Sequence, residues 1–422
     1  MVQKQIFQTF VTEVIIPFFS GTKIILGNEP LPLRNRSKLV TQCPRKGANY
    51  QKLMPSKKAD YCLSIQRSLP FSHDEISFLQ LFLKAAEEIN IYKDMDKAYF
   101  LDRINSLTTF TIAKTLGFEN ISYQVIYNMI NWSQQTYEGQ NIAMCIGIDA
   151  TLPQNGNLSN VSFNDIVDED FLKVLSNGYD TMIQLDKNGI FYNLMPLKEN
   201  DDEKVYAPFR FSKVARWTAG NQNIAFVLNR NGEILIFKNG ELTFARRNGK
   251  WFFYSHMQAI KKIAEGTGRS FPADTREAIY LTALDVAFSR TGGCIGFVKN
   301  NKKNLFNQSS ILLEENNFNA SKMDDKTKVL YSIVDKKKFH EIPRLLRMEL
   351  AAIDGATLIS HEEKFISIGA ILRLQGNGLS STGGGRTLAA MSLGKFGLGI
   401  KISNDGYIKF YTDSSDPILQ IN

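Results

Sequence analysis

The 422-residue sequence predicts a protein of the α/β (α+β) class, because helical and strand patterns follow one another along the whole chain. Apolar residues recur at helical spacing through 71–140, and strands separated by tight turns fill much of 141–268. From 269 to 422, helices alternate with hairpins, which predicts a mixed sheet covered by helices. At about 100–200 residues per domain, this length suggests two or three domains, each able to bury its own core.

The segment 71–140 is predicted to be a helical region. Ser72 and Glu75 have the spacing of a capping box, in which each side chain satisfies a free backbone amide at a helix start. A helix to about residue 89 follows, and two more are predicted near 95–116 and 122–137. Their large apolar residues indicate core-facing sides rather than a cofactor site.

The segment 141–268 is predicted to be an α+β region. A strand over 142–148 and a short helix around 168–175 come first, and a β-meander over 182–254 follows. Four Asn-Gly pairs separate the apolar runs of the meander, and Asn-Gly supplies the positive φ angles of tight hairpins. These pairs are Asn188-Gly189, Asn231-Gly232, Asn239-Gly240 and Asn248-Gly249. The basic, aromatic hairpin end at 245–251 could clasp a phosphate or base, or be a solvated turn anchored by its tryptophan.

The excess positive charge lies at the N-terminus. Residues 1–70 hold 11 Lys+Arg against 3 Asp+Glu, whereas the rest of the chain holds 39 of each. Six of the 12 prolines also fall there, so the sequence predicts a basic, proline-rich irregular arm. Such an arm could neutralise nucleic-acid phosphates, or it could pack over the next domain or a partner subunit. No dense basic cluster with interleaved aromatics marks a binding stripe, which favours packing.

Cysteine usage and hydropathy limit the class of protein. The four cysteines stand far apart without a Cys-x-x-Cys pair, and four histidines do not complete a metal cage. No run of roughly 18 apolar residues is present, and the apolar segment 6–19 contains Glu13 and Pro17 without a cleavage pattern. We therefore expect a soluble, cytoplasmic protein with reduced thiols, no membrane partner and no signal peptide.

The segment 269–422 contains two features that point to anion chemistry. Five of the ten residues 376–385 are glycine, and a helix is predicted to start near Arg386. Glycine amides, the positive end of a helix and an arginine together make a plausible phosphate cradle, although such a stretch can also be a simple loop. Asp354, followed by Gly355 at a helix-to-strand junction, could bind a divalent metal or accept a ribose proton, or be a solvated turn residue.

These features carry a family resemblance. The runs Leu345–Ala356, Gly369-Ala370 and Ile400–Gly406, with the glycine-rich stretch between them, resemble the diadenylate cyclase domain of the DNA-integrity-scanning protein. The resemblance covers about a third of the chain, roughly Ala273–Tyr411. It implies that Asp354 is associated with the catalytic metal, Mg²⁺ or Mn²⁺, and with the 3′-hydroxyl of ATP. It also implies that two protomers face each other, so a homodimer or higher oligomer would be needed for catalysis.

The sequence departs from the family at the phosphate-binding run. Gly384, Gly385, Arg386, Thr387 and Leu388 stand where Gly, Thr, Arg, His and Arg are found in active members. The loss of one arginine removes a charge-assisted bond worth roughly 1.5–3 kcal/mol, which apolar leucine cannot replace. Binding would therefore survive this change better than catalysis.

Weaker similarity upstream, at 132–139, 229–233 and 244–247, resembles a branch of the superfamily proposed to sense nucleotides. The leading hypothesis is thus a nucleotide-binding sensor for ATP or a cyclic dinucleotide such as cyclic di-AMP. The alternatives are an active diadenylate cyclase, and a scaffold or nucleic-acid adaptor acting through the basic arm. The predicted catalytic and metal-binding residue is Asp354, and the predicted nucleotide-binding residues are Gly355, Ala356, Gly383, Gly384, Gly385, Arg386 and Thr387. His340 and His361 are expected to be solvated.

Overall fold

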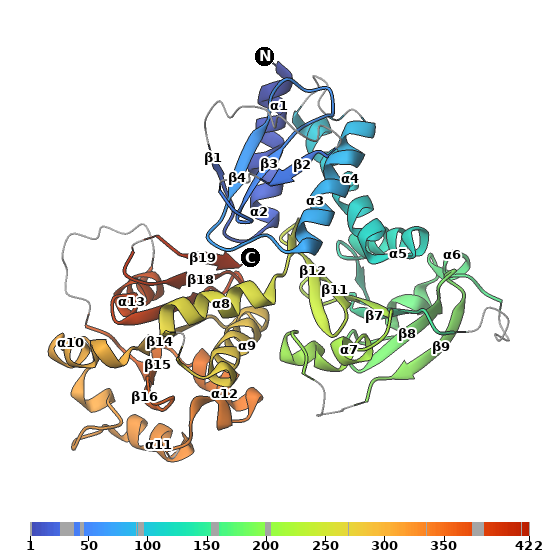
Figure 1. Cartoon of the computed structure of the whole chain (residues 1–422). Coiled ribbons are helices and arrows are strands. Elements are labelled where there is room, and N and C mark those ends of the chain that lie inside the picture. The colour runs from blue at the N-terminus through green and yellow to red at the C-terminus, as the bar shows by residue number, and fades with distance from the viewer. Residues whose placement is uncertain are drawn as a thin grey trace. The chain divides into compact units, whose positions relative to one another are not determined.

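The computed structural model in Figure 1 has the α+β class that the sequence predicts, with mixed sheets and helices along the chain. It describes residues 2–25, 38–42, 46–89, 91, 97–152, 160–198, 204–268, 270–334, 336–373, 384–414 and 416–421. The chain forms two compact units. The N-terminal unit consists of Met1–Tyr206 and Phe211–Tyr254, and the C-terminal unit consists of Ala207–Arg210 and Ser255–Asn422.

The first 70 residues fold, so the prediction of an irregular arm is wrong for the part that the structure describes. A helical run comes first and a four-stranded antiparallel sheet follows, in the order β1-β4-β3-β2. Its elements are α1 (Val2–Phe10), a π-helical turn (Val11–Ile15), α2 (Ile16–Phe18), β1 (Lys23–Ile25), β2 (Val40–Gln42), β3 (Tyr50–Leu53) and β4 (Leu63–Gln66). Phe7, Phe10 and Phe18 are buried, and burying such aromatic residues stabilises the helices despite the prolines.

Part of the positive charge in this segment is structural. Arg67 is buried and forms an ion pair with the buried Glu75, and Lys52 is also buried. Lys46 lies over the Tyr50 ring at 4.5 Å from its centroid. These three cations are engaged within the N-terminal unit, which leaves fewer of them to contact nucleic acid.

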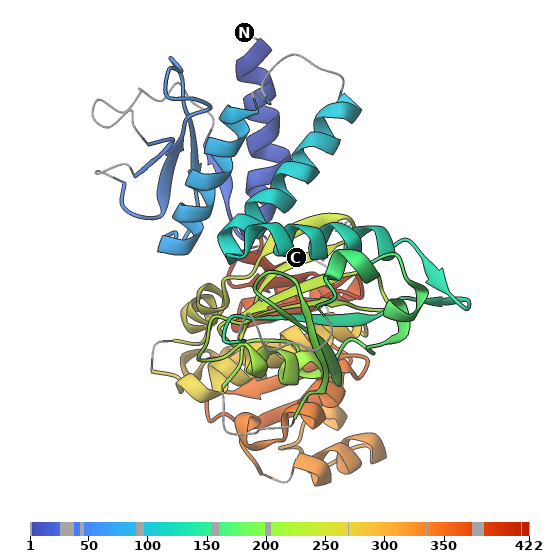
Figure 2. The ribbon, with the colours of Figure 1, turned by 90° about the vertical axis from the view of Figure 1, so that its right-hand side faces the viewer.

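Three helices follow the small sheet: α3 (His73–Glu88), α4 (Lys97–Leu116) and α5 (Glu119–Trp132). The predicted capping box is confirmed at the start of α3, where Glu75 N donates to Ser72 Oγ at 3.2 Å and Ser72 N donates to the Glu75 carboxylate at 2.7 Å. Figure 2 shows α1, α3 and α4 standing beside the small blue sheet. The apolar sides of these helices share one core with the sheet, as their periodicity predicts.

A seven-stranded mixed sheet forms the rest of the N-terminal unit, in the order β13-β12-β11-β10-β7-β8-β9. Its strands are β7 (Met144–Asp149), β8 (Thr181–Asp186), β9 (Phe191–Pro196), β10 (Ile224–Leu228), β11 (Ile234–Lys238), β12 (Glu241–Arg247) and β13 (Lys250–Phe253). The hairpin β5–β6 (Thr136–Tyr137, Gln140–Asn141), α6 (Phe163–Ile166), α7 (Ser212–Trp217) and 3₁₀ turns at Asp170–Val174 and Phe209–Phe211 connect them.

Two of the four predicted Asn-Gly turns have positive φ at both residues, whereas at Asn188-Gly189 and Asn231-Gly232 only the glycine does. The meander is not continuous. Asn239, Gly240, Asn248 and Gly249 all have positive φ, as type I′ hairpin turns require. Strands β10 to β13 do form a meander, whereas β8 and β9 lie on the other side of β7. Strand β8 runs parallel to β7, and a parallel pair needs a crossover connection that alternation of apolar residues does not reveal.

The C-terminal unit is built on a six-stranded sheet in the order β16-β15-β14-β17-β18-β19 (Figure 1). Strands β14 and β15 are parallel and the other pairs are antiparallel. The strands are β14 (Gly293–Val298), β15 (Ala356–Ser360), β16 (Phe365–Ala370), β17 (Gly397–Ile402), β18 (Ile408–Tyr411) and β19 (Leu419–Ile421). The helices are α8 (His256–Thr267), α9 (Ala273–Ser289), α10 (Lys303–Gln308), α11 (Asp325–Val334), α12 (Arg344–Ala352) and α13 (Gly385–Gly394), with 3₁₀ turns at Asn300–Lys302, Glu314–Asn316 and Phe339–Glu341.

Helices cover both faces of this sheet. On β17, a Cβ at Gly399 would lie 1.8 Å from Ala390 O of α13, whereas its neighbour Leu398 lies against Gly266 of α8. Neighbouring residues of a strand face opposite sides, so α13 and α8 lie on opposite faces. In the part of the chain that is described, no helix is long and apolar enough to cross a bilayer.

A buried ion pair links the runs 229–233 and 244–247, two of the three upstream runs in the family resemblance. Arg247 Nε donates to Glu233 Oε1 at 2.7 Å, and both side chains are buried in the N-terminal unit. Asn229 Nδ2 donates to the other carboxylate oxygen at 2.7 Å. The runs 229–233 and 244–247 are thus held together as a structural contact, and Trp251 of the neighbouring strand is buried in the same core.

We expect Glu233→Ala to destabilise the N-terminal unit by about 3–5 kcal/mol, because it leaves the Arg247 charge buried without its partner. Urea unfolding followed by tryptophan fluorescence measures this, since all three tryptophans, Trp132, Trp217 and Trp251, lie in this unit. Glu88→Ala is the matched control: it breaks an exposed pair with Lys84 and should cost less than about 1 kcal/mol. Equal effects of the two variants would contradict a structural role for the buried pair.

Candidate functional site

Asp354 lies in a turn that only glycine can complete. Helix α12 ends at Ala352, and the chain enters β15 at Ala356 through Gly355, whose φ is +108°. A Cβ on Gly355 would lie 2.5 Å from the carbonyl carbon of Gly369 on the neighbouring strand, so backbone packs directly on backbone here. The Asp354 side chain is exposed at this turn.

The start of helix α13 provides the second half of the candidate site. Its N-cap residue is Gly384, which has no side chain to cap the free backbone amides of the first turn. Arg386 and Thr387 follow in the first turn, where the aligned peptide dipoles amount to about half a positive charge. Gly383 and the other glycines of 376–383 lie outside the described residues.

The structure brings the two halves together around one cavity of about 360 Å³. It lies beside the N-terminal ends of the parallel strands β14 and β15. Its lining residues are Cys294, Asp354, Gly355, Ala356, Ala370, Ile371, Leu372, Gly385, Arg386 and Ala389. Gly384 and Thr387 flank Gly385 and Arg386 at the same helix start, outside this lining set.

The Arg386 guanidinium is held by the turn between β17 and β18. Its Nη1 donates to Asn404 Oδ1 at 2.6 Å. A Cβ at Gly292 would lie 2.1 Å from that oxygen and 2.5 Å from Nη1, so glycine at this position leaves the room for the contact. This hydrogen bond uses one of five guanidinium donors, and no other partner of them is found among the described residues.

Thr387 and Cys294 differ in what they can offer a ligand. The Thr387 hydroxyl oxygen is buried and has no hydrogen-bond partner among the described residues. Such an atom is a candidate to bond a ligand oxygen. Burial raises the pKa of the Cys294 thiol to about 12, while the nearby Arg386 charge acts in the opposite direction. Cys294 is therefore a neutral wall residue at neutral pH and not a nucleophile.

Sequence reasoning missed five of the lining residues, Cys294, Ala370, Ile371, Leu372 and Ala389, and the supporting residues Asn404 and Gly292. Nothing in the spacing of Asn404 indicates contact with a residue 18 positions upstream. Ile371 and Leu372 lie just after β16, which ends at Ala370, so they line the cavity where the strand stops. No local sequence pattern could have identified these residues, because their contacts depend on the order of the strands in the sheet.

Comparisons with known proteins give distant likenesses only. No protein-family model matches the chain, and no curated protein matches it. Among solved structures, DacA from Staphylococcus aureus is 20% identical with a TM-score of 0.20, over 32% of this chain and 80% of that one. A hypothetical membrane spanning protein from Bacillus cereus is 12% identical with a TM-score of 0.26, over 43% of this chain and 94% of that one. We therefore base the functional proposals on the residues of this chain.

We expect Gly355→Ala to destabilise the C-terminal unit by about 3 kcal/mol or more, because it adds both φ strain and a backbone clash. Gly385→Ala is the matched control, since its Cβ would meet nothing within 4 Å and alanine favours a helix by about 1 kcal/mol. Scanning calorimetry measures both, with tryptophan fluorescence identifying the transition of the N-terminal unit. Equal stability of the two variants would contradict the close packing at this turn.

Proposed function

We propose that the C-terminal unit binds a nucleoside phosphate in the cavity lined by Asp354 and Arg386, and that it acts as a nucleotide sensor. The observation that carries the proposal is that one cavity is lined by a carboxylate, a guanidinium and an apolar wall. A nucleotide offers the matching groups, namely ribose hydroxyls, phosphates and an aromatic base. ATP and cyclic di-AMP are the candidate ligands that the family resemblance implies.

The phosphates would lie at the start of α13. Backbone amides and the dipole at a helix N-terminus favour an anion, and arginine adds bidentate, charge-assisted bonds. The Thr387 hydroxyl in the same turn is buried without a partner among the described residues, but it does not line the cavity. Arg386 already has its side chain positioned by Asn404, so little side-chain entropy would be lost on binding.

Asp354 would face the ribose or a metal ion at the other end of the cavity. Mg²⁺ in nucleotide sites is bound through one or two carboxylates together with substrate phosphates, so a single exposed carboxylate fits it. Mg²⁺ or Mn²⁺, when bound with a nucleotide, would neutralise phosphate charge. Within the described residues, no group of three or more His, Cys, Asp or Glu side chains gathers to hold a metal without a ligand.

The base would lie against the apolar wall made by Ala370, Ile371, Leu372 and Ala389. Ile371 is 59% exposed, which is unusual for a large aliphatic side chain and leaves surface for a ligand to cover. Leu388 stands where active family members have their second arginine. The loss of that charge favours binding without turnover, and hence a sensor.

The direct test is calorimetric titration of the full chain with ATP and Mg²⁺. We expect Arg386→Ala to weaken binding about tenfold or more, because one charge-assisted contact to phosphate is worth roughly 1.5–3 kcal/mol. Lys322→Ala, which removes an exposed charge that does not line the cavity, should leave the affinity within about twofold. Unchanged binding by Arg386→Ala would refute the proposed site.

The exposed Asp354 carboxylate at the cavity favours a second candidate, an active diadenylate cyclase. This activity requires two protomers, each presenting one ATP to the other. Incubation with ATP and Mn²⁺, followed by mass spectrometry for cyclic di-AMP, distinguishes it from a sensor. Product that disappears in Asp354→Asn would establish the enzyme, and ATP binding without product would establish the sensor.

A further inference from the structure

A second, larger cavity lies in the C-terminal unit, at the other end of the same two parallel strands. Its volume is about 530 Å³, within the range of small-molecule sites. It is lined by Val298 and Ser360, the last residues of β14 and β15, whereas Cys294 and Ala356 near the first ends line the cavity described above. The two cavities share no lining residue.

The rim of this second cavity is strongly basic. Lys303, Lys336, Lys337 and Lys364 line it and are exposed, and Glu362 is the one carboxylate among its described lining residues. Glu362 Oε1 lies 3.9 Å from Lys303 Nζ. The other three lysines have no carboxylate partner in the described part of the chain. With four lysines and one carboxylate among the described lining residues, the rim carries net positive charge, which favours an anion.

The floor of the cavity is aromatic. Phe306, Phe318 and Phe365 line it and are buried, and Tyr331 is half-buried beside them. The rings of Phe318 and Tyr331 meet edge to face, with centroids 5.4 Å apart. Inorganic phosphate or a metal ion would leave this apolar floor unused. The combination of a basic rim and an aromatic floor matches an anion with an aromatic body.

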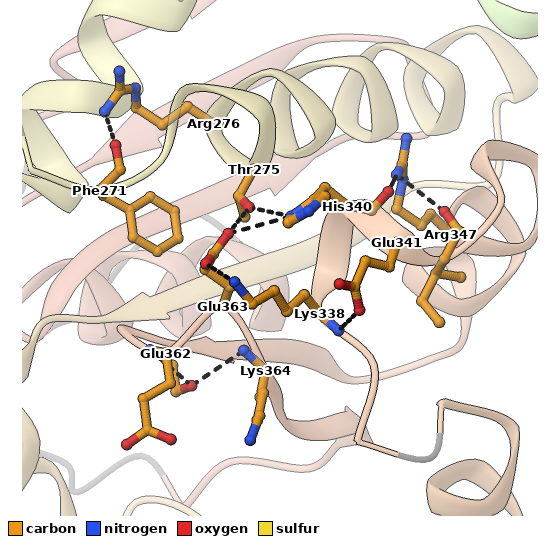
Figure 3. A network of polar contacts seen from close by, with 12 residues as sticks. Phe271, Thr275, Arg276, Lys338, His340, Glu341, Arg347, Glu362, Glu363 and Lys364 are labelled. Atoms are coloured by element: carbon orange, nitrogen blue, oxygen red, sulfur yellow. Dashed lines mark hydrogen bonds and ion pairs between the residues drawn. The ribbon is translucent and has the colours of Figure 1, made fainter.

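One wall of the cavity is fixed by a polar network, which Figure 3 shows. Glu363, in the turn between β15 and β16, has φ +68°, and its buried carboxylate accepts hydrogen bonds from Thr275 Oγ1 and, at 2.8 Å, from Lys338 Nζ. His340 Nδ1 lies 2.7 Å from Thr275 Oγ1 and 3.2 Å from Glu363 Oε2. The expectation that His340 is solvated is therefore wrong, because its ring contacts Thr275 and Glu363. Both partners are distant in sequence, so local pattern could not predict these contacts.

The network holds Glu363 on one side of the turn, so the side chains of its neighbours Glu362 and Lys364 lie on the side of the second cavity. In Figure 3 the Glu362 and Lys364 side chains point away from Thr275 and His340. Both line the second cavity. Burial alone would raise the pKa of Glu363, but the hydrogen bonds from Lys338 and Thr275 hold it below its ordinary value. The carboxylate stays ionised at neutral pH, so this wall is preorganised for a ligand.

We infer that this cavity is a second ligand site that takes a nucleoside monophosphate, with the base on the aromatic floor and the phosphate among Lys336, Lys337 and Lys364. The inference does not depend on the proposed function, because none of its residues lines the first cavity. The exposed amide side chain of Asn307 lies at the rim, where it can bond a base edge.

The test is calorimetric titration with AMP of the full chain carrying Arg386→Ala, in which the first cavity is weakened. We expect measurable binding that Lys336→Glu/Lys337→Glu weakens about tenfold or more, because charge-assisted bonds to the phosphate are replaced by repulsion. Lys261→Glu/Lys322→Glu makes the same charge change at two exposed lysines outside the cavity and should alter the affinity less than about twofold.

A second variant tests the cavity without changing charge. Asn307→Trp places a large ring at the rim and should also weaken AMP binding about tenfold, with circular dichroism confirming the fold. Adenosine, which lacks the phosphate, should bind about tenfold more weakly than AMP. Absent AMP binding in the Arg386→Ala chain, or binding that neither set of cavity variants alters, would overturn the inference while leaving the first site to be judged by ATP binding alone.

Discussion

The close approach of two backbones at Gly355 and Gly369 is the constraint on which the candidate site depends. It brings the end of α12 directly onto the edge of β16 and starts β15 beside β14. Asp354 is thereby placed at one end of the parallel strand pair with its carboxylate exposed. Any side chain at position 355 would push these strands apart, and the carboxylate would no longer line the same cavity as Arg386.

The parallel pair β14–β15 also organises the rest of the unit. Each end of the pair opens into a cavity, and each cavity has a polar contact that fixes its charged wall. Asn404 holds Arg386 at one end, and the Thr275–His340–Lys338 network holds Glu363 at the other. Both contacts join residues from different elements, so the sheet acts as a rigid frame for the two cavities.

Local patterns in the sequence predicted local structure well. The Ser72–Glu75 capping box and the turns at Asn239-Gly240 and Asn248-Gly249 form as predicted, because each is determined within a few residues. Contacts between distant segments were not predictable in this way. The fold of 1–70, the parallel pairing of β8 with β7 and the contact of His340 with Glu363 all depend on partners far along the chain. Asp354 and Arg386 were identified from residue type, but their shared cavity and the role of Asn404 required the sheet order.

The central claim is that the turn at Asp354 and the start of α13 bind one ligand together. Hydrogen exchange measured by mass spectrometry, with and without ATP and Mg²⁺, tests this directly, because ligand contact slows exchange of the amides it covers. The account predicts that peptides spanning 353–357 and 384–388 are protected together, and that Arg386→Ala reduces both effects at an ATP concentration near the Kd of the unchanged chain. Protection of one segment without the other, or undiminished protection in Arg386→Ala at that concentration, would contradict a single shared site.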